Sequence, residues 1–395
     1  MNIRKNFLSL AVPDITDEER KEVLEALDSG WISTGPKVKE FESQFGVYHN
    51  VKHAIAMSSC TTALFIAAKV LGIGKGDFVI VPTITWQSTA NIVEQLGATP
   101  LFCDVEIDTL NIRHEDVEFY VKQYGQKIKA IIPVHHSGLP VDIDWFSGIS
   151  DKHGIPIIYD AAHAVFSTYK NKPVGQFGSM AAFSFYATKN LTTGDGGMIT
   201  TNDDELAEQC RTWSYHGLPK DSWKRYSAEN ASPHVQSIVP GYKFNLTDIQ
   251  AALGLAQMKR KEDLLSKRNY LVETYNEILK EFAWIQRPVF KTKEGKWGNH
   301  VYVIKILDEE IDRDKFMQEL RKLNIGTNLH FYPVHKNDFY EKKYPDINLP
   351  NAEWLMNRIL TIPLCTKYSG EDLGYVAEAM KFVYDNKLAH HTILV

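Results

Sequence analysis

Short apolar runs alternate with amphipathic stretches over the first half of the chain. The runs HAIAMSS, FVIVP, TPLFCDV, KAIIPV, PIIYD, MAAFSF and GMITT have the length and composition of buried strands. Helical segments separate most of them, and this alternation predicts a doubly wound, largely parallel sheet covered by helices. Before the first run, Thr16 and Glu19 form a capping box that predicts a helix start, and Gly30 predicts the end of that helix.

The pattern changes after residue 214. Residues 214–241 form a long polar stretch with interspersed aromatic and basic side chains, and such loops in compact enzymes are usually functional or mobile. A helical pattern then covers residues 249–279, which is long enough to link two domains. Farther on, HVYVIKI and TIPLC predict strands mixed with two or three helices. We therefore expect a large domain over residues 1–265, including the N-terminal segment, and a smaller C-terminal α/β domain over residues 266–395.

Composition narrows the class of protein. The chain has 395 residues, of which 44% are hydrophobic and 24% charged, so it can bury a substantial core. The net charge of −5 and the scattered basic residues argue against a nucleic-acid partner. Its four cysteines are far apart and form no CxxC pair, which suits a reducing compartment. No apolar run approaches the ~18 residues of a membrane span, so we expect a soluble cytoplasmic protein.

Two ionisable residues follow apolar runs and suggest a common site. Asp160 ends the run IPIIYD, and Lys189 follows MAAFSF and precedes a glycine-rich segment. Ligands of open α/β sheets bind outside the carboxyl ends of the strands, where both residues are expected. Pyridoxal 5′-phosphate (PLP) needs such a pair: Lys189 would form a Schiff base with its aldehyde, and Asp160 would keep its pyridine nitrogen protonated. Taken singly, they are more simply a surface lysine and a strand-end cap.

A candidate phosphate site favours the cofactor interpretation. The segment MSSCTTAL passes from a strand to a helix through small residues, and the N-terminus of a helix binds phosphate through its amides and its dipole. We assign the cofactor phosphate to this helix start, with Cys60 and Thr61 as ligands and Ser184 as a second hydroxyl donor. The alternative is that the serines and threonines only cap the helix.

Trp86 and His163 are candidates to contact the cofactor ring. Trp86 follows the strand FVIVP, so its flat face could stack on the pyridine; the alternative is a core tryptophan at a helix start. His163 lies one turn beyond Asp160 and could touch the cofactor or its phenolic oxygen, although a lone buried histidine is more often only hydrogen-bonded.

A metal site is not expected from the histidines. His135 and His136 are adjacent, so on a strand they would point to opposite faces. His330 and His335 are interrupted by Pro333, with no acidic or cysteine ligand close in sequence. Neither pair therefore provides a ligand set.

Several longer motifs stand in a specific order and spacing: GWISTGPKVKEFE, SSCTTAL, PTITWQSTAN, DAAHA, SFYATKNLTTGDGGMITT, SYHGL, PGYKFNLTDIQAALGLAQ and LHFYPVH. With them, the chain resembles the DegT/StrS-type nucleotide-sugar aminotransferases, PLP-dependent enzymes of fold type I, over nearly its whole length. Cys60, Tyr186 and Asp195 stand where many relatives carry glycine, histidine and glutamate. Lys189 argues against the dehydratase branch of that family, in which a histidine replaces the lysine.

The resemblance implies a homodimer with two active sites at the interface. Asn245 occupies the position of an asparagine that reaches the cofactor phosphate of the partner subunit. Thr34 and Gly35 would lie near the sugar. His216, in the loop after residue 214, and His330, in LHFYPVH, would help to bind the nucleotide sugar.

The expected reaction transfers an amino group from L-glutamate to a nucleotide-linked keto-deoxysugar, with PLP and pyridoxamine 5′-phosphate alternating in ping-pong half-reactions. The motif PGYKFNLTDIQAAL resembles relatives that act at the sugar C4 more than those that act at C3, so the resemblance implies a 4-amino product, and we expect a UDP- or dTDP-4-keto-6-deoxyhexose as substrate. The products of such enzymes enter lipopolysaccharide and related glycans. The alternatives are amination at C3, a GDP-linked sugar, another PLP lyase of this fold, and a non-catalytic regulatory protein. A regulator would not need Lys189, Asp160 and a phosphate-ready helix together.

Overall fold

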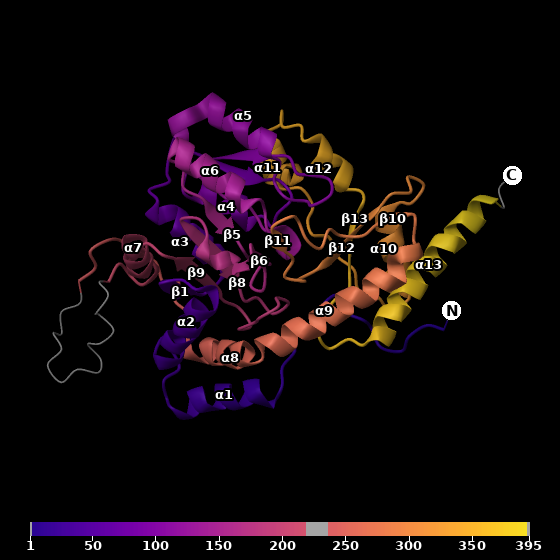
Figure 1. The fold of residues 1–395 in the computed structure, drawn as a ribbon, viewed down its shortest axis with the longest axis horizontal. Helices are drawn as coiled ribbons and strands as arrows, with labels where there is room; N and C mark the ends of the chain where they lie inside the picture. Colours follow the sequence, from indigo (N-terminus) through magenta and orange to yellow (C-terminus); the bar gives the residue numbers. More distant parts are fainter. Residues whose placement is uncertain (1, 219–235, 393–395) are drawn as a thin grey trace.

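A central sheet organises the larger body of the molecule (Figure 1). The computed structural model describes residues 2–218 and 236–392. A four-stranded ladder in the order β1-β9-β8-β5 and a three-stranded ladder in the order β3-β2-β4 meet through parallel bridges between β4 and β5, at Ile131–Ile157 and Val134–Asp160. The strands are β1 (His53–Met57), β2 (Phe78–Pro82), β3 (Thr99–Cys103), β4 (Ile128–Ile131), β5 (Ile158–Asp160), β8 (Met180–Ser184) and β9 (Gly197–Thr201).

The strand directions confirm the predicted mostly parallel sheet. Within it, β9 runs antiparallel to β1 and β8, whereas the pairs β5–β8, β2–β3 and β2–β4 are parallel. All seven predicted runs of the first half form these strands. The carboxyl ends of β5 and β8 therefore lie side by side, which determines where the residues that follow them can act.

Helices cover both faces of the sheet, because side chains alternate between the faces along each strand. In β2, Ile80 packs into one hydrophobic core, while Val79 and Val81 pack into another. The first core is closed by α2 (Pro36–His49), α5 (His114–Tyr124), α6 (Ile143–His153) and α8 (Asp248–Lys259). The second is closed by α3 (Cys60–Val70), α4 (Ser88–Gln95) and α7 (Asp204–Ser214).

A second sheet and its helices form the smaller body. Strand β12 (Tyr302–Ile306) pairs antiparallel with β10 (Ile285–Gln286) and β13 (Ile359–Ile362), as HVYVIKI and TIPLC predict. Its core contains residues of α9 (Lys261–Ile278), α10 (Arg313–Lys322) and α13 (Gly370–Thr392). Leu8, near the start of the chain, joins this core and pairs with Ile325. The N-terminal segment, assigned to the large domain by the sequence, thus packs against C-terminal residues.

The long helical run predicted over residues 249–279 is two helices rather than one. They meet at Arg260, whose backbone leaves the helical geometry, and α9 then crosses from the larger body to the smaller one (Figure 1). The domain boundary predicted at residue 265 falls inside α9 and stays a prediction.

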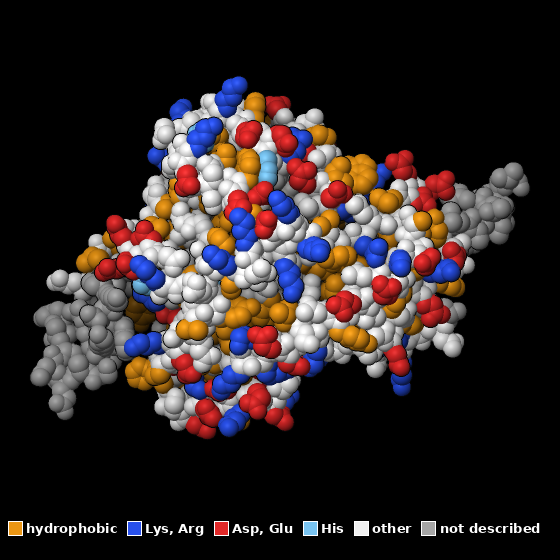
Figure 2. All heavy atoms as spheres, in the orientation of Figure 1, with side chains coloured by type: hydrophobic (Ala, Val, Ile, Leu, Met, Phe, Trp, Pro, Cys, Tyr) orange, Lys and Arg blue, Asp and Glu red, His pale blue; other side chains and the backbone are white. Residues whose placement is uncertain are grey.

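Shorter elements complete the described chain. Helices α11 (Asp338–Lys343) and α12 (Pro350–Leu355) return to the larger body, where the Tyr340 hydroxyl donates to Asn91 Oδ1 at 2.7 Å. A small sheet combines β6 (Thr168–Tyr169), β7 (Lys172–Pro173) and β11 (Gly295–Lys296). On the face drawn in Figure 2, basic and acidic side chains are interspersed. No helix in the described parts of the chain is long and apolar enough to cross a membrane.

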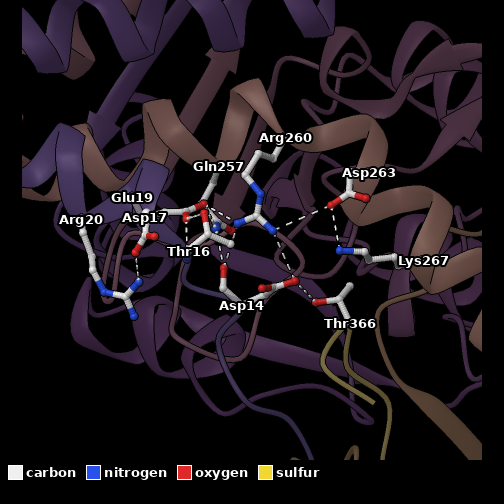
Figure 3. A network of polar contacts seen from close by, with 10 residues as sticks. All are labelled: Asp14, Thr16, Asp17, Glu19, Arg20, Gln257, Arg260, Asp263, Lys267 and Thr366. Carbon is white, nitrogen blue, oxygen red and sulfur yellow. Dashed lines mark hydrogen bonds and ion pairs between the residues drawn. The ribbon is translucent and has the colours of Figure 1, made fainter. Parts of the chain in front are cut away.

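A polar network supports the junction between α8 and α9 (Figure 3). Glu19, in α1 (Asp17–Asp28), is fully buried and accepts hydrogen bonds from Thr16 N at 2.7 Å, Gln257 Nε2 at 2.7 Å and Arg260 Nη1 at 2.6 Å. Burial alone would raise the pKa of Glu19, but these hydrogen bonds outweigh it and lower the pKa to about 2. The predicted capping box of Thr16 and Glu19 is confirmed, and it is part of a larger tertiary contact.

Removing the arginine from this network should destabilise the fold. Arg260→Met leaves the buried Glu19 carboxylate without its cation, and breaking a buried ion pair on one side costs about 3 kcal/mol or more. Arg20→Met is the matched control, because Arg20 pairs with Asp17 on the same helix at the exposed surface and should change stability little. Urea unfolding of the two variants measures the difference, and equal midpoints would contradict this account of the network.

Candidate active site

Asp160 and Lys189 are brought to one place by the parallel pairing of β5 and β8. Asp160 is the last residue of β5 and is 4% exposed. Lys189 follows β8 after a turn in which its amide donates to the carbonyl oxygen of Tyr186 at 2.9 Å. The two side chains interact electrostatically. The Asp160 carboxylate is also fixed by hydrogen bonds, from Thr89 Oγ1 at 2.8 Å and from the amide of Ala162 at 3.1 Å.

Burial shifts the pKa values of both groups toward the neutral forms. For Lys189, desolvation outweighs the attraction of Asp160 and lowers the pKa to about 8. For Asp160, desolvation raises the pKa against the hydrogen bonds from Thr89 and Ala162 and the charge of Lys189. The Lys189 amine is therefore readily deprotonated, and an additional cation would stabilise the charged form of Asp160. This combination suits covalent carbonyl chemistry.

The helix start predicted to bind phosphate has free amides. Ser59 caps α3: its Oγ accepts from Thr62 N at 3.1 Å, and its carbonyl accepts from Ala63 N at 3.1 Å. The capping role is therefore present, but it uses neither the Cys60 nor the Thr61 amide, which have no partner within the helix. A Cβ on Gly197 of β9 would lie 2.4 Å from the Ser59 oxygen and 2.6 Å from the Cys60 nitrogen, so only glycine permits this packing.

The side chains around this helix start also have partners. Thr61 Oγ1 donates to Ser88 Oγ at 2.9 Å, and the Cys60 thiol donates to the carbonyl of Ala182 at 3.7 Å. Burial raises the pKa of Cys60 well above its usual value, so its thiol is not activated as a nucleophile. Ser184, at the end of β8, is buried, and its Oγ accepts from Tyr186 N at 3.4 Å. These residues lie where the sequence places a phosphate site, and their roles there stay predictions.

His163 lies within a group of buried aromatic rings. Its ring centroid is 4.4 Å from that of His300, 5.5 Å from Phe331, 6.0 Å from His330 and 6.5 Å from His136. Burial, together with the charge of Lys189, lowers the pKa of His163 well below its usual range, so the ring is neutral. Its Nδ1 is buried without a hydrogen-bond partner in the described structure. A ligand atom could satisfy this nitrogen.

The other predicted contact residues have different surroundings. Trp86 is 59% exposed, with its ring 5.9 Å from Phe331, so it is not a core tryptophan and one face is available. His330 Nδ1 is hydrogen-bonded to Thr361 Oγ1 at 2.9 Å. From their sequence, His135 and His136 were considered as strand residues. They instead follow β4, at a 3₁₀ turn. Within residues 2–218 and 236–392, no group of three or more histidine, cysteine, aspartate or glutamate side chains could hold a metal ion.

Thr34, Gly35 and Asn245 form a separate group. Asn245 Nδ2 donates to Thr34 Oγ1, and Asn245 pairs with Met57 at the end of β1. The Gly35 amide donates to Asp248 Oδ1 at 2.7 Å. The contacts described for this group do not include Lys189.

His216 is exposed and in the left-handed backbone region with φ of 57°. Its amide donates to the Tyr242 carbonyl at 2.7 Å. Residues 219–235 of the predicted functional loop lie outside the described residues.

The structure adds site residues that the sequence analysis did not single out. Thr89 contacts Asp160, Asn190 follows Lys189 and is hydrogen-bonded to His300, and the rings of His300 and Phe331 lie against that of His163. Thr89 lies in the motif PTITWQSTAN and Asn190 directly follows the lysine, so both stood within recognised motifs. Phe331 lies in the motif LHFYPVH, whereas His300 stands just before β12 with no local indication of a site.

The site combines four features that fit PLP. They are the buried Asp160 carboxylate, the Lys189 amine with its lowered pKa, the amides at the start of α3 and the unpartnered Nδ1 of His163. The fold and site thus define a PLP-dependent enzyme of fold type I. The sequence matches the DegT/DnrJ/EryC1/StrS aminotransferase family over residues 13–381, and the chain belongs to that family.

Relatives agree with this assignment. The chain is 42% identical over 383 residues to the spore coat polysaccharide biosynthesis protein SpsC of Bacillus subtilis, covering 96% of this chain and 97% of that protein. The sugar aminotransferase Spr1654 of Streptococcus pneumoniae, solved with PMP, superposes with a TM-score of 0.89 at 33% identity, covering 96% and 99% of the two chains. Its PLP form matches equally well, at 32% identity with the same TM-score and coverage.

A third solved structure is PseC of Helicobacter pylori, an aminotransferase involved in pseudoaminic acid biosynthesis. It has a TM-score of 0.88 at 27% identity, over 96% of this chain and 100% of that one. The chain is therefore a PLP-dependent sugar aminotransferase.

Proposed function

We propose that this aminotransferase moves an amino group from L-glutamate to the keto carbon of a nucleotide-linked keto-deoxysugar, with Lys189 as the reacting amine. The observation that carries this proposal is the meeting of the Lys189 amine, whose pKa is about 8, with the buried Asp160 carboxylate at neighbouring strand ends. We favour C4 of a UDP- or dTDP-4-keto-6-deoxyhexose, based on the motif PGYKFNLTDIQAAL. Amination at C3, or of a GDP-linked sugar, is the alternative.

Asp160 and Lys189 have different roles around the cofactor. PLP, when bound, supplies an electron sink for the electrons released at the reacting carbon. Asp160 would hold a proton on the pyridine nitrogen and would itself stay ionised opposite that charge. The Lys189 amine would take the proton from the amino donor's α-carbon and deliver it to C4′ of the cofactor, in a role that its lowered pKa permits near neutral pH.

The remaining predicted residues bind and orient. The Cys60 and Thr61 amides, at the start of α3, and the Ser184 hydroxyl, at the end of β8, would hold the phosphate. The exposed Trp86 would stack on the cofactor ring, and the unpartnered His163 Nδ1 would contact the cofactor. We assign Thr34, Gly35, His216 and His330 to the sugar nucleotide.

A substrate panel tests the proposed specificity. The enzyme is incubated with L-glutamate and matched 4-keto and 3-keto sugars carrying UDP, dTDP or GDP, and the products are identified by mass and NMR. A 4-amino product from a UDP- or dTDP-linked sugar is expected. Turnover of only 3-keto sugars, or of sugars without a nucleotide, would overturn the assignment. L-Alanine and L-aspartate as donors test the choice of glutamate.

We further propose a cytoplasmic homodimer in which Asn245 contacts the partner's cofactor phosphate. All four cysteines, Cys60, Cys103, Cys210 and Cys365, are free thiols, which suits the cytoplasm. Asn245 is half-buried at the end of β1, with its amide held by Thr34. This position, beside but outside the group around Lys189, supports a contact made across an interface.

Subunit complementation tests the shared site. Lys189→Ala and Asn245→Ala dimers are each expected to be strongly impaired, but mixing them should restore activity. In a mixed dimer, one site combines an intact Lys189 with the partner's intact Asn245, while the other receives both substitutions. Activity should therefore approach about half that of the unsubstituted enzyme per mixed dimer.

The mixing experiment requires proof of exchange. A tagged subunit must be recovered together with an untagged one, and the complemented activity should rise with the fraction of mixed dimers. If exchange is complete, Asn245→Ala is impaired alone, and no activity returns, Asn245 acts within its own chain.

A further inference from the structure

Asn190, the residue after Lys189, is held from both sides in the interior. It is 4% exposed, its Nδ2 donates to the Gly298 carbonyl at 2.6 Å, and its Oδ1 lies 2.9 Å from Nδ1 of His300. We propose that His300 and Asn190 form a positioning pair that fixes the amine of the half-buried Lys189 in its place beside Asp160. This inference rests on the proposed role of Lys189.

The direction of the hydrogen bonds follows from the partners. The Gly298 carbonyl can only accept, so the Asn190 amide nitrogen must face it, and the amide oxygen must face His300. His300 Nδ1 then carries the hydrogen and donates. Burial, followed by the charges of Lys189 and Arg268, lowers the pKa of His300 well below its usual range, which is consistent with a neutral ring of defined tautomer.

His300 is itself anchored to the helix that joins the two bodies. Arg268 of α9 is 4% exposed and donates from Nη1 to the Asn299 carbonyl at 3.1 Å and to the His300 carbonyl at 3.0 Å. Asn299 adopts φ of 53°, so the chain turns sharply just before His300. The pair thus connects the lysine turn on the larger body to α9 and to the segment that begins β12.

The geometry explains why the lysine needs such support. The Lys189 turn is closed by one backbone hydrogen bond, to Tyr186, and the lysine side chain must leave and re-enter its site in each catalytic cycle. A fixed Asn190 returns the amine to the same desolvated position beside Asp160. The ring of His300 also lies against that of His163. His300 is therefore next to His163, a predicted cofactor contact, and to Asn190, the residue after Lys189.

The test measures the Lys189 amine in cofactor-free protein. Labelling with trinitrobenzenesulfonate across pH, followed by peptide mass spectrometry, gives the pKa of this lysine without turnover. We expect a midpoint near 8 in the unsubstituted protein. His300→Leu removes the donor, so the amine should reach water, and its pKa should rise by about one unit or more toward the ordinary value near 10.4.

A conservative variant separates positioning from packing. His300→Asn can place an amide donor near the former Nδ1 and should restore the low midpoint at least in part. In holoenzyme, His300→Leu should lower kcat about tenfold or more with little change in KM for the amino donor, because His300 is proposed to act through Asn190 on the position of Lys189. Asn190→Ala should reproduce both effects and carries the test if His300→Leu does not fold.

The control is another buried histidine. His49 of α2 packs against Phe45 and Phe183 and has no hydrogen bond to either ring nitrogen in the described structure, so His49→Leu should leave the Lys189 midpoint and kcat unchanged. The proposal is overturned if His300→Leu and Asn190→Ala keep the Lys189 midpoint and kcat of the unsubstituted protein. It is also overturned if His300→Asn is as impaired as His300→Leu. A different result would contradict the proposed role of Lys189 itself. In that case, borohydride reduction of the unsubstituted holoenzyme would attach the cofactor to a residue other than Lys189.

Discussion

Replacing Lys189 by alanine is expected to abolish transamination and the visible absorbance of the lysine-bound cofactor while leaving the fold intact. The variant loses both the covalent attachment and the proton-transferring amine, and proton transfer alone contributes ~10²- to 10⁴-fold to rates. We therefore expect kcat to fall by at least about a thousandfold. Absorbance spectra of the protein with added PLP, and single-turnover assays with L-glutamate, measure the two losses.

Lys170→Ala is the control for the loss of a lysine. Lys170 pairs with Asp144 at the surface, and its removal should change neither absorbance nor rate. Circular dichroism should be the same for both variants and the unsubstituted protein. A Lys189→Ala enzyme that still converts glutamate at a comparable rate would refute the assigned role of this lysine.

Replacing Asp160 by alanine should leave PLP bound through its phosphate but remove most of the rate. A neighbouring opposite charge shifts a pKa by ~1 to 3 units, so without Asp160 the pyridine nitrogen should be protonated ~10- to 1000-fold less. A neutral pyridine withdraws electrons poorly, and kcat should fall in proportion. Rates are measured at saturating cofactor, with PLP affinity determined separately by titration.

Two further variants identify the property that matters. Asp160→Asn keeps the shape but not the charge and should be nearly as slow as Asp160→Ala. Thr89→Val removes one hydrogen bond to the carboxylate, made at 2.8 Å, and should have a much smaller effect because the charge remains. If Asp160→Asn were nearly as active as the unsubstituted enzyme, the proton on the pyridine nitrogen would have to be held by another group.

The strands of the larger body could be predicted because their information is local. Each is a short, buried, apolar run, and the parallel order follows from the helices between them. Two features were not local. The helical run after residue 248 shows no sequence break at Arg260, whose departure from helical geometry coincides with its contacts to Glu19 and Asp14. The second is the docking of the N-terminal segment, in which Leu8 pairs with Ile325, more than 300 positions away.

The residues of the site also differ in whether local sequence information identifies them. Lys189 and Asp160 could be inferred because each follows an apolar run and has a chemistry that the other completes. The partners that tune them come from elsewhere: Thr89 is 71 residues from Asp160, and His300 is 110 residues from Asn190. Such contacts depend on how the segments pack in three dimensions, and the sequence around His300, just before β12, does not indicate its partner.

The pairing of Leu8 with Ile325 has a consequence for biosynthesis. The amide of Gly326 donates to the Leu8 carbonyl at 2.7 Å, and that of Leu364 donates to the Leu10 carbonyl at 3.1 Å. Leu8 and Leu10 therefore leave the ribosome more than 300 positions ahead of these neighbours, and the contacts cannot form until the neighbours have been translated. The larger sheet, whose strands end by residue 201, can form earlier, since domains fold as units during synthesis. The order of translation thus differs from the order of assembly, and the N-terminal segment is among the last parts to dock.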